Sequence, residues 1–225
     1  PGAGGSNPLN LIVILAALAV LPFLLIMVTS FVKVAVVLSI LRQAIGAQQV
    51  PPNQVITGLA IVLSLYIMAP VGHDIYRAIA PQLDGVQNQE KELTFEDVRT
   101  MTTRGVEPLR RFLTRHADPR ERQLLYELSA DLRAPDQQLN LGPKNLLVLI
   151  PAFVVTELKE AFTIGFILFV PFIIVDLVVA NILLSLGMHM LSPTTISLPF
   201  KLLLFVIVDG WFLVVKGLVL GYAPP

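Results

Sequence analysis

Residues 184–193 read LSLGMHMLSP, and long apolar runs lie on either side of them, at 161–183 and 196–208. Gly187 and Pro193 are the kind of residues expected in a short link between two helices. Both runs are rich in residues that form hydrophobic helices. The stretch therefore predicts the tip of a hydrophobic helical hairpin.

This tip carries four large side chains between its turn residues, namely Met188, His189, Met190 and Leu191. Methionine is unbranched and polarizable, so it fills irregular gaps and adapts to changing neighbours. The spacing alone leaves two interpretations open. Met188 and Met190 pack against the turn itself, or they serve a function at the end of the hairpin.

The composition of the whole chain is that of a membrane protein. Of its 225 residues, 55% are hydrophobic and only 14% are charged, whereas about a quarter of the residues of a soluble domain are charged. The formal net charge is zero, so nothing points to nucleic acid. The chain contains no cysteine, which excludes a disulfide framework, a thiolate metal site and a cysteine nucleophile.

Charged residues concentrate in the middle of the chain, between Asp74 and Lys144, and are sparse on both sides. This distribution predicts an all-α, membrane-associated fold in which two long helical hairpins flank a small polar helical domain. We expect four parts: an N-terminal tail at 1–8, a first hydrophobic hairpin at 9–72, a polar helical domain at 73–145, and a second hydrophobic hairpin with the methionine-containing tip at 146–225.

Glycine and proline residues predict where the two hairpins turn. A link at 43–54 contains Gly46, Pro51 and Pro52, which together break a helix. For the second hairpin we expect one arm at 146–186, kinked or broken near Pro151 and Pro171, then a tip at 187–199 and a return arm at 200–222.

The flanking charges indicate an orientation. Lys33 and Arg42 flank the first tip and Lys201 flanks the second, so the excess of positive charge near the tips places both toward the cytoplasm and the polar domain outside. The apolar run at 9–28 has about the 20 residues that a membrane span needs. We expect this run to be a mature segment and not a signal peptide.

Charges also interrupt the second hairpin, where an Asp or Lys at a helix centre costs roughly 2.5–3.5 kcal/mol on insertion into a membrane. Asp209 and Lys216 share a helix face but stand about 10 Å apart along the axis. We therefore expect inter-helix or inter-subunit partners. Structural ion pairs, a proton or ion relay, and snorkelling near the interface all remain open. The residues concerned are Glu157, Lys159, Glu160, Asp176, Lys201, Asp209 and Lys216.

Motifs of catalysis and of cofactor binding are missing from the sequence. It contains no HExxH, GxSxG, Walker or Rossmann pattern, and its three histidines are scattered. Glu157 and Glu160 have the i,i+3 spacing of a carboxylate metal motif, but no histidine follows at the right offset. We interpret them as a charge cluster at the start of a helix. We expect no enzyme activity, no cofactor and no metal.

Four strings of the chain together resemble one family. They are TSFVKVAVVLSILRQAIG (29–46), VPPNQV (50–55), TELKEAFTIGFILFVPFIIVDLVVA (156–180) and SPTTISLPFKLLLFVIVDGW (192–211). In these strings the chain is similar to the FliP/SctR family, the export-gate proteins of bacterial flagella and type III secretion injectisomes. The resemblance covers nearly the whole chain outside 84–140, and the second and fourth strings look closer to the injectisome branch.

The resemblance implies a pore-forming subunit of the export gate, through which unfolded proteins cross the bacterial inner membrane. It implies a homo-oligomer, which the family suggests is a pentamer. The implied partners are the Q-type (SctS/FliQ) and R-type (SctT/FliR) gate proteins, other export components, and unfolded substrates, with no nucleic acid. The polar domain would be periplasmic, and the assembly would be part of the secretion system's basal body.

The resemblance also assigns a role to the hairpin tip. In the family a methionine-rich tip forms a gasket that seals the pore, and here it maps onto Gly187, Met188, His189 and Met190. His189 stands where relatives often have a third methionine. It either makes the seal respond to pH or points away from the pore axis. The alternative class of function is a small ion-coupled transporter that uses Asp176 and Lys201 as a relay.

Overall fold

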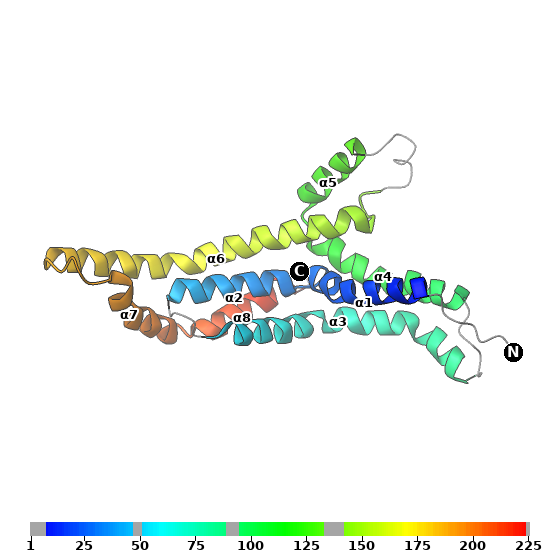
Figure 1. Ribbon diagram of the computed structural model, residues 1–225, viewed down its shortest axis with the longest axis horizontal. Helices are drawn as coiled ribbons and strands as arrows, with labels where there is room; N and C mark the ends of the chain where they lie inside the picture. The colour runs from blue at the N-terminus through cyan, green and yellow to red at the C-terminus, as the bar shows by residue number, and fades with distance from the viewer. Residues whose placement is uncertain (1–7, 47–50, 89–94, 133–141, 224–225) are drawn as a thin grey trace.

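A computed structural model describes residues 8–46, 51–88, 95–132 and 142–223, and within these ranges the chain forms eight helices and no strand. The expected all-α class is confirmed. Figure 1 shows an elongated molecule in which α6 runs along most of the long axis. The helices are α1 (Pro8–Met27), α2 (Phe31–Ile45), α3 (Asn53–Asn88), α4 (Phe95–His116), α5 (Pro119–Asp131), α6 (Leu146–Ser185), α7 (Pro193–Ile207) and α8 (Gly210–Leu220).

Two of these helices are long and apolar enough to cross a membrane. They are α3, over Asn53–Leu83, and the whole of α6. Two further spans are possible by length and composition if each of two bent helix pairs counts as one. One pair is Leu18–Met27 with α2, bent by 68°, and the other is α7 with α8, bent by 59°.

The second hairpin differs from its expected outline in three places. Of the kink or break expected near Pro151 and Pro171, the break is excluded, because α6 is one helix of 40 residues that contains both prolines. The tip is shorter than expected: α7 already begins at Pro193, whose fixed φ suits the first helical position. The return arm is two helices, because Asp209 adopts a left-handed conformation, φ 51°, between α7 and α8.

The first half of the chain also departs from the expected boundaries. The division expected between residues 72 and 73 falls inside α3, which continues to Asn88 although its sequence turns polar at Asp74. Helical structure depends on the backbone conformation and not on the polarity of the side chains. Pro70 does not end α3 either. The middle of the chain is helical as expected, with α4 and α5 joined at Ala117 and Asp118.

Helix α2 lies at the centre of the larger hydrophobic core. Val34, Val37, Leu38 and Leu41 are fully buried at the i, i+3, i+4, i+7 spacing of one helix face. They pack against residues of α3, α6, α7 and α8. The contact with α6 is especially close at Gly165, where an added Cβ would lie 2.4 Å from Ile40 Cδ1.

A second core joins the polar helices to the start of α6. Phe112 and Leu113 of α4 pack there against Leu149 and Phe153 of α6, and Tyr222 from the C-terminal turn closes the cluster. Aromatic rings dominate this core, with centroid distances of 5.7 Å between Phe112 and Phe153 and 6.1 Å between Phe112 and Tyr222. The two cores therefore fix α6 along its first half.

Candidate functional site

The hairpin tip begins with a well-defined helix end. The backbone N–H of Met188 donates to the carbonyl of Leu183, at 2.9 Å, and that of Gly187 donates to the carbonyl of Leu184, at 3.1 Å. These two bonds form the Schellman motif, which needs a left-handed residue after the helix. Gly187 supplies it with φ +73°. The motif turns the chain sharply and directs residues 188–191 away from the axis of α6.

The side chains of this tip are not packed within the chain. Met190 is 100% exposed, and Met188, His189 and Leu191 are exposed as well. Of the two interpretations that the spacing left open, packing against the turn therefore fails for Met190. Figure 1 shows the tip at one end of the molecule, beyond the ends of α2 and α3.

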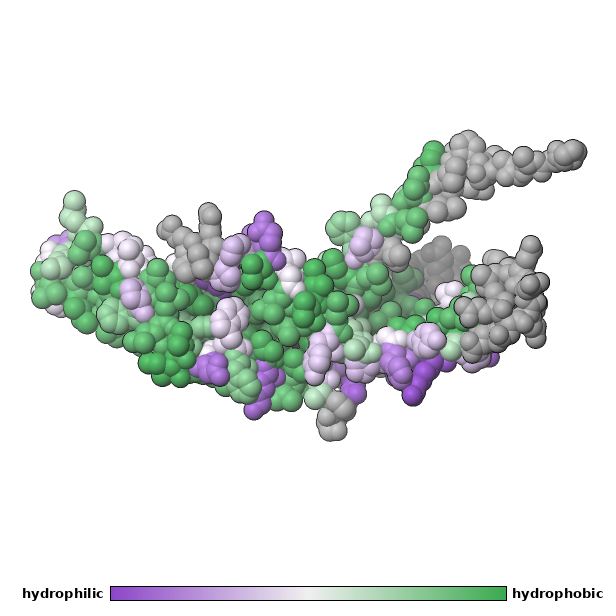
Figure 2. All heavy atoms as spheres, turned by 90° about the horizontal axis from the view of Figure 1, so that it is seen from below, coloured by the Kyte–Doolittle hydropathy of each residue, from purple (hydrophilic) through white to green (hydrophobic). Residues whose placement is uncertain are grey.

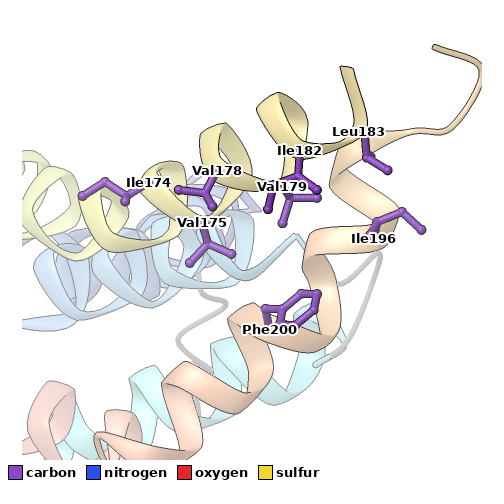
Figure 3. A pocket seen from close by; sticks show the side chains of 8 residues that line it. All are labelled: Ile174, Val175, Val178, Val179, Ile182, Leu183, Ile196 and Phe200. Carbon is purple, nitrogen blue, oxygen red and sulfur yellow. The ribbon is translucent and has the colours of Figure 1, made fainter. Parts of the chain in front are cut away.

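An apolar groove of about 440 Å³ lies directly behind the tip, between α6 and α7. Figure 3 shows side chains of both helices along it, among them Val179 and Leu183 from α6, and Ile196 and Phe200 from α7. Figure 2 shows that hydrophobic residues cover much of this end of the molecule. The tip is thus continuous with a large apolar surface.

Among the charges in the apolar helices, the most buried pair joins α2 to α6. Lys33 Nζ lies 3.1 Å from Glu157 Oε1 and 2.6 Å from Glu160 Oε2. The side chain of Lys33 is 3% exposed and that of Glu157 is 0% exposed. Charges this deep need partners, because an isolated buried ion costs several kcal/mol. The pair therefore fixes the register of α6 on α2.

The C-terminal turn completes this cluster. Tyr222 donates its hydroxyl hydrogen to Glu157 Oε2, and its ring lies 4.2 Å from Lys33 Nζ, measured to the ring centroid. A cation over an aromatic face is attracted to it. Lys33, Glu157 and Tyr222 thus connect three segments that are far apart in the sequence.

Lys159 points to the opposite side of α6, toward α5. Its Nζ lies 3.1 Å from Glu121 Oε1 and 3.8 Å from Asp118 Oδ2, and its side chain is 56% exposed. The link between α4 and α5 is held by a further bond, from the backbone N–H of Asp118 to Thr156 Oγ1, at 3.0 Å. Neighbouring charges of α6 therefore serve different helices.

The pair Asp176 and Lys201 holds α7 against α6. Lys201 Nζ lies 2.6 Å from Asp176 Oδ2, and Lys201 is only 4% exposed. Ser197 donates its hydroxyl hydrogen to the other carboxylate oxygen of Asp176. Gly46, at the end of α2, is so close that an added Cβ would lie 3.4 Å from Lys201 Nζ. The ammonium thus lies at the negative end of the α2 dipole.

The last two charges, Asp209 and Lys216, form no ion pair with any residue in the part of the chain that the structure describes. Asp209 occupies the bend between α7 and α8. Asp209 and Lys216 therefore do not lie on the one straight helix that the sequence suggested. Lys216 lies over its own helix neighbour Phe212, with Nζ 5.4 Å from the ring centroid. Inter-subunit partners for both residues remain a prediction.

The roles of two residues in the buried cluster, Lys33 and Tyr222, could not be predicted from the sequence. The sequence marks Lys33 only as a charge that flanks the first tip, and no motif in it marks Tyr222. The i,i+3 spacing of Glu157 and Glu160 was the available signal, since it puts both carboxylates on one face. Their interpretation as a helix-start cluster is wrong, because α6 begins at Leu146 with the Asn145 side chain as its cap.

Over the described ranges, no group of three or more His, Cys, Asp or Glu side chains is arranged to hold a metal ion. The ionisable clusters are instead ion pairs between helices. Buried ion pairs inside long apolar helices, with an exposed apolar tip, define a helical membrane protein whose charges hold its helices together.

Comparison with known proteins gives the family. The FliP family model matches residues 14–218, so the chain belongs to the FliP family. It is 48% identical over 217 residues to the Yop proteins translocation protein R of Yersinia pestis, covering 96% of this chain and 97% of the relative.

Other relatives come from different secretion and flagellar systems. Identity is 41% over 213 residues to the hypersensitivity response secretion protein HrcR of Ralstonia nicotianae, covering 95% of this chain and 96% of the relative. It is 39% over 218 residues to the flagellar biosynthetic protein FliP of Bacillus subtilis, covering 96% and 93%. The chain therefore matches these relatives over nearly their whole length.

Proposed function

We propose that the chain is a pore-forming subunit of a type III protein export gate in the bacterial inner membrane. Unfolded substrate proteins pass through the gate, and residues 187–190 seal it when it is closed. Membership of the FliP family supports the export role, and the higher identity to translocation protein R supports the injectisome branch. The observation that carries the seal is the complete exposure of Met190 in the tip that follows α6.

The apolar surface of the molecule supports assembly with neighbours. Large hydrophobic side chains are exposed along α1, the second half of α6, α7 and α8. Exposed apolar patches of this extent mark contacts with protein or lipid. We propose that copies of this chain, five by analogy with the family, assemble with Q-type and R-type gate proteins and other export components. Two hydrophobic hairpins would then flank a periplasmic polar domain.

The ion pairs explain how such an apolar subunit keeps its shape. Lys33 with Glu157, and Lys201 with Asp176, are satisfied within one chain. The outer face of the second half of α6 is therefore free to present apolar side chains to neighbours. Several copies of one tip around an axis would form a deformable methionine ring, which closes an irregular gap and yields to a passing chain.

The seal is tested by recording the conductance of assembled gate complexes in planar bilayers. The double variant Met188→Ser with Met190→Ser should conduct ions at rest while the wild type does not. Leu132→Ser is a matched control, because Leu132 is also an exposed apolar side chain but lies at the end of α5. Equally closed complexes in the wild type and the tip variant would refute the seal.

The role of His189 is tested in the same recordings. Comparing acidic and neutral pH, with and without His189→Met, shows whether a ring of histidines alters the seal. The same pH dependence in both proteins would exclude that role.

The transporter alternative rests on one observation, the direct contact of Asp176 with Lys201. A relay would carry ions or protons in a single-component preparation. Asp176→Asn would abolish that flux in reconstituted vesicles, whereas the gate subunit alone should give no flux to abolish. Substrate-independent ion exchange by the pure chain would therefore favour the alternative.

A further inference from the structure

A second cavity, of about 390 Å³, lies at the other end of the fold, between α3, α4 and the turn that follows α8. Its volume is within the range of roughly 300–1,000 Å³ that is typical of small-molecule sites. Its inner wall is apolar and includes the buried rings of Phe112 and Tyr222 together with Val71. Of the residues that line it, Tyr222 also belongs to the Lys33–Glu157 cluster described above, and none belongs to the tip.

Two arginines of α4 line the mouth of this cavity. Arg111 and Arg115 are exposed and lie one helical turn apart, at i and i+4. Neither guanidinium makes an ion pair or a hydrogen bond with any residue of the described ranges. Like charges at this spacing repel each other. An anion between them would relieve that repulsion and accept charge-assisted hydrogen bonds from both.

The other ionisable groups of the cavity leave it positively charged at neutral pH. Asp74 contributes one negative charge against the two arginines. His116 contributes none, because its pKa is lowered to about 4, first by burial and then by the positive charges of Lys33 and Arg115. The wall of the cavity therefore carries an excess of positive charge over an apolar interior.

The position of the cavity along α3 indicates where such an anion would come from. From Asn53 to His73 the helix carries no Asp, Glu, Lys or Arg, and Asp74 is its first charged residue. At 1.5 Å per residue this uncharged stretch is about 30 Å long, close to the thickness of the hydrocarbon core. The cavity lies near the polar end of this stretch. If the stretch crosses the hydrocarbon core, the cavity is at the level of the lipid headgroups.

We infer that this cavity binds the phosphate group of an acidic phospholipid. Arg111 and Arg115 hold the phosphate oxygens, and the start of the acyl chains lies against Phe112 and Val71. Free inorganic phosphate shares the chemistry of the headgroup but makes no use of the apolar wall. A lipid therefore fits both halves of the cavity, whereas a small anion fits only its mouth.

The full chain in mild detergent is titrated with phosphatidylglycerol, with phosphatidylcholine as the neutral lipid, and bound lipid is counted by native mass spectrometry. The wild type should retain phosphatidylglycerol in preference. Arg111→Gln with Arg115→Gln should weaken its retention by more than about tenfold, since each substitution loses a hydrogen bond to a charged group and one such bond alone contributes about tenfold. Asp74→Asn should strengthen retention, a gain that misfolding cannot imitate.

A charge-matched control is Arg99→Gln with Arg120→Gln, which removes two exposed arginines of the same polar region that do not line the cavity. This control should retain the lipid like the wild type. Equal loss in the control, or unchanged retention in the cavity variant, would overturn the site. Competition by inorganic phosphate as strong as that of the lipid would overturn its assignment to a lipid. A changed oligomeric mass of the cavity variant would instead identify a contact between subunits.

Discussion

The two halves of α6 have different surroundings. In the first half, Leu149, Phe153 and Glu157 are completely buried against α2, α4 and the C-terminal turn. In the second half, Phe166 and Ile167 are largely exposed, and beyond the end of α6 Met190 is completely exposed. One continuous helix thus folds onto its own chain at one end and offers an apolar surface at the other. Burial within the subunit fixes the fold of the first half, while the second half and the tip stay exposed in the single chain.

The largest loss of stability is expected from breaking the buried ion pair in the first half of α6. Lys33→Met removes the cation that faces Glu157, leaving a carboxylate that is 0% exposed without its ion-pair partner. Breaking a buried pair from one side costs about 3–5 kcal/mol, so we expect a large loss of thermal stability in mild detergent or no folded protein.

Lys159→Met is the matched control for that substitution, because Lys159 is also a lysine paired across helices but is mostly exposed. Its variant should unfold close to the wild type. A Lys33→Met protein that is as stable as the Lys159→Met protein would show that the buried pair does not hold α2 to α6.

A moderate effect is expected where α6 crosses α2. Gly165→Ala places a methyl group 2.4 Å from Ile40 Cδ1, so the two helices must shift, at a cost of about 1–3 kcal/mol for overpacking. Gly187→Ala meets no atom within 4 Å and loses only the left-handed freedom of glycine, about 1 kcal/mol. Thermal unfolding should show that Gly165→Ala is the less stable of the two variants. A less stable Gly187→Ala would contradict the close contact between α6 and α2.

At neutral pH no effect is expected from His116, but acid should destabilise the second core. His116 has its pKa lowered from 6.5 to about 4, mainly by burial. Between these values the unfolded chain binds a proton that the folded chain does not, so the free energy of unfolding falls as the pH falls from about 6.5 toward 4. Unfolding curves of the wild type and His116→Gln at several pH values measure this. An equally steep loss in both proteins would exclude His116 as the cause.

Much of this organisation could be predicted from the sequence. The turn at 184–193 follows from Gly187 and Pro193, and the need of Asp176 and Lys201 for partners follows from their place in apolar helices. The identity of the partners could not be predicted, because pairing of Lys33 with Glu157 joins helices more than a hundred residues apart. Such contacts depend on how helices pack, which no local pattern encodes.

The helix boundaries were the weakest part of the prediction, for a physical reason. Proline normally ends or kinks a helix, yet Pro151 and Pro171 lie inside α6, which stays helical along its contact with α2. Conversely, α7 and α8 separate at Asp209, inside the run at 200–222 that we expected to be one arm. At this bend Gly210 packs so closely against Phe205 that an added Cβ would lie 2.1 Å from the ring, so only glycine fits there. Tertiary packing decided both cases.

The convergence of the tips on one axis is tested most directly by cysteine crosslinking, which is clean because the chain has no cysteine of its own. Met190→Cys is introduced into the assembled gate complex, oxidised, and examined on a non-reducing gel beside Leu132→Cys as an exposed control. Tips that meet around a pore give disulfide-linked dimers for Met190→Cys and none for Leu132→Cys. Intact complexes in which Met190→Cys stays entirely monomeric on the gel would contradict a seal built from these tips.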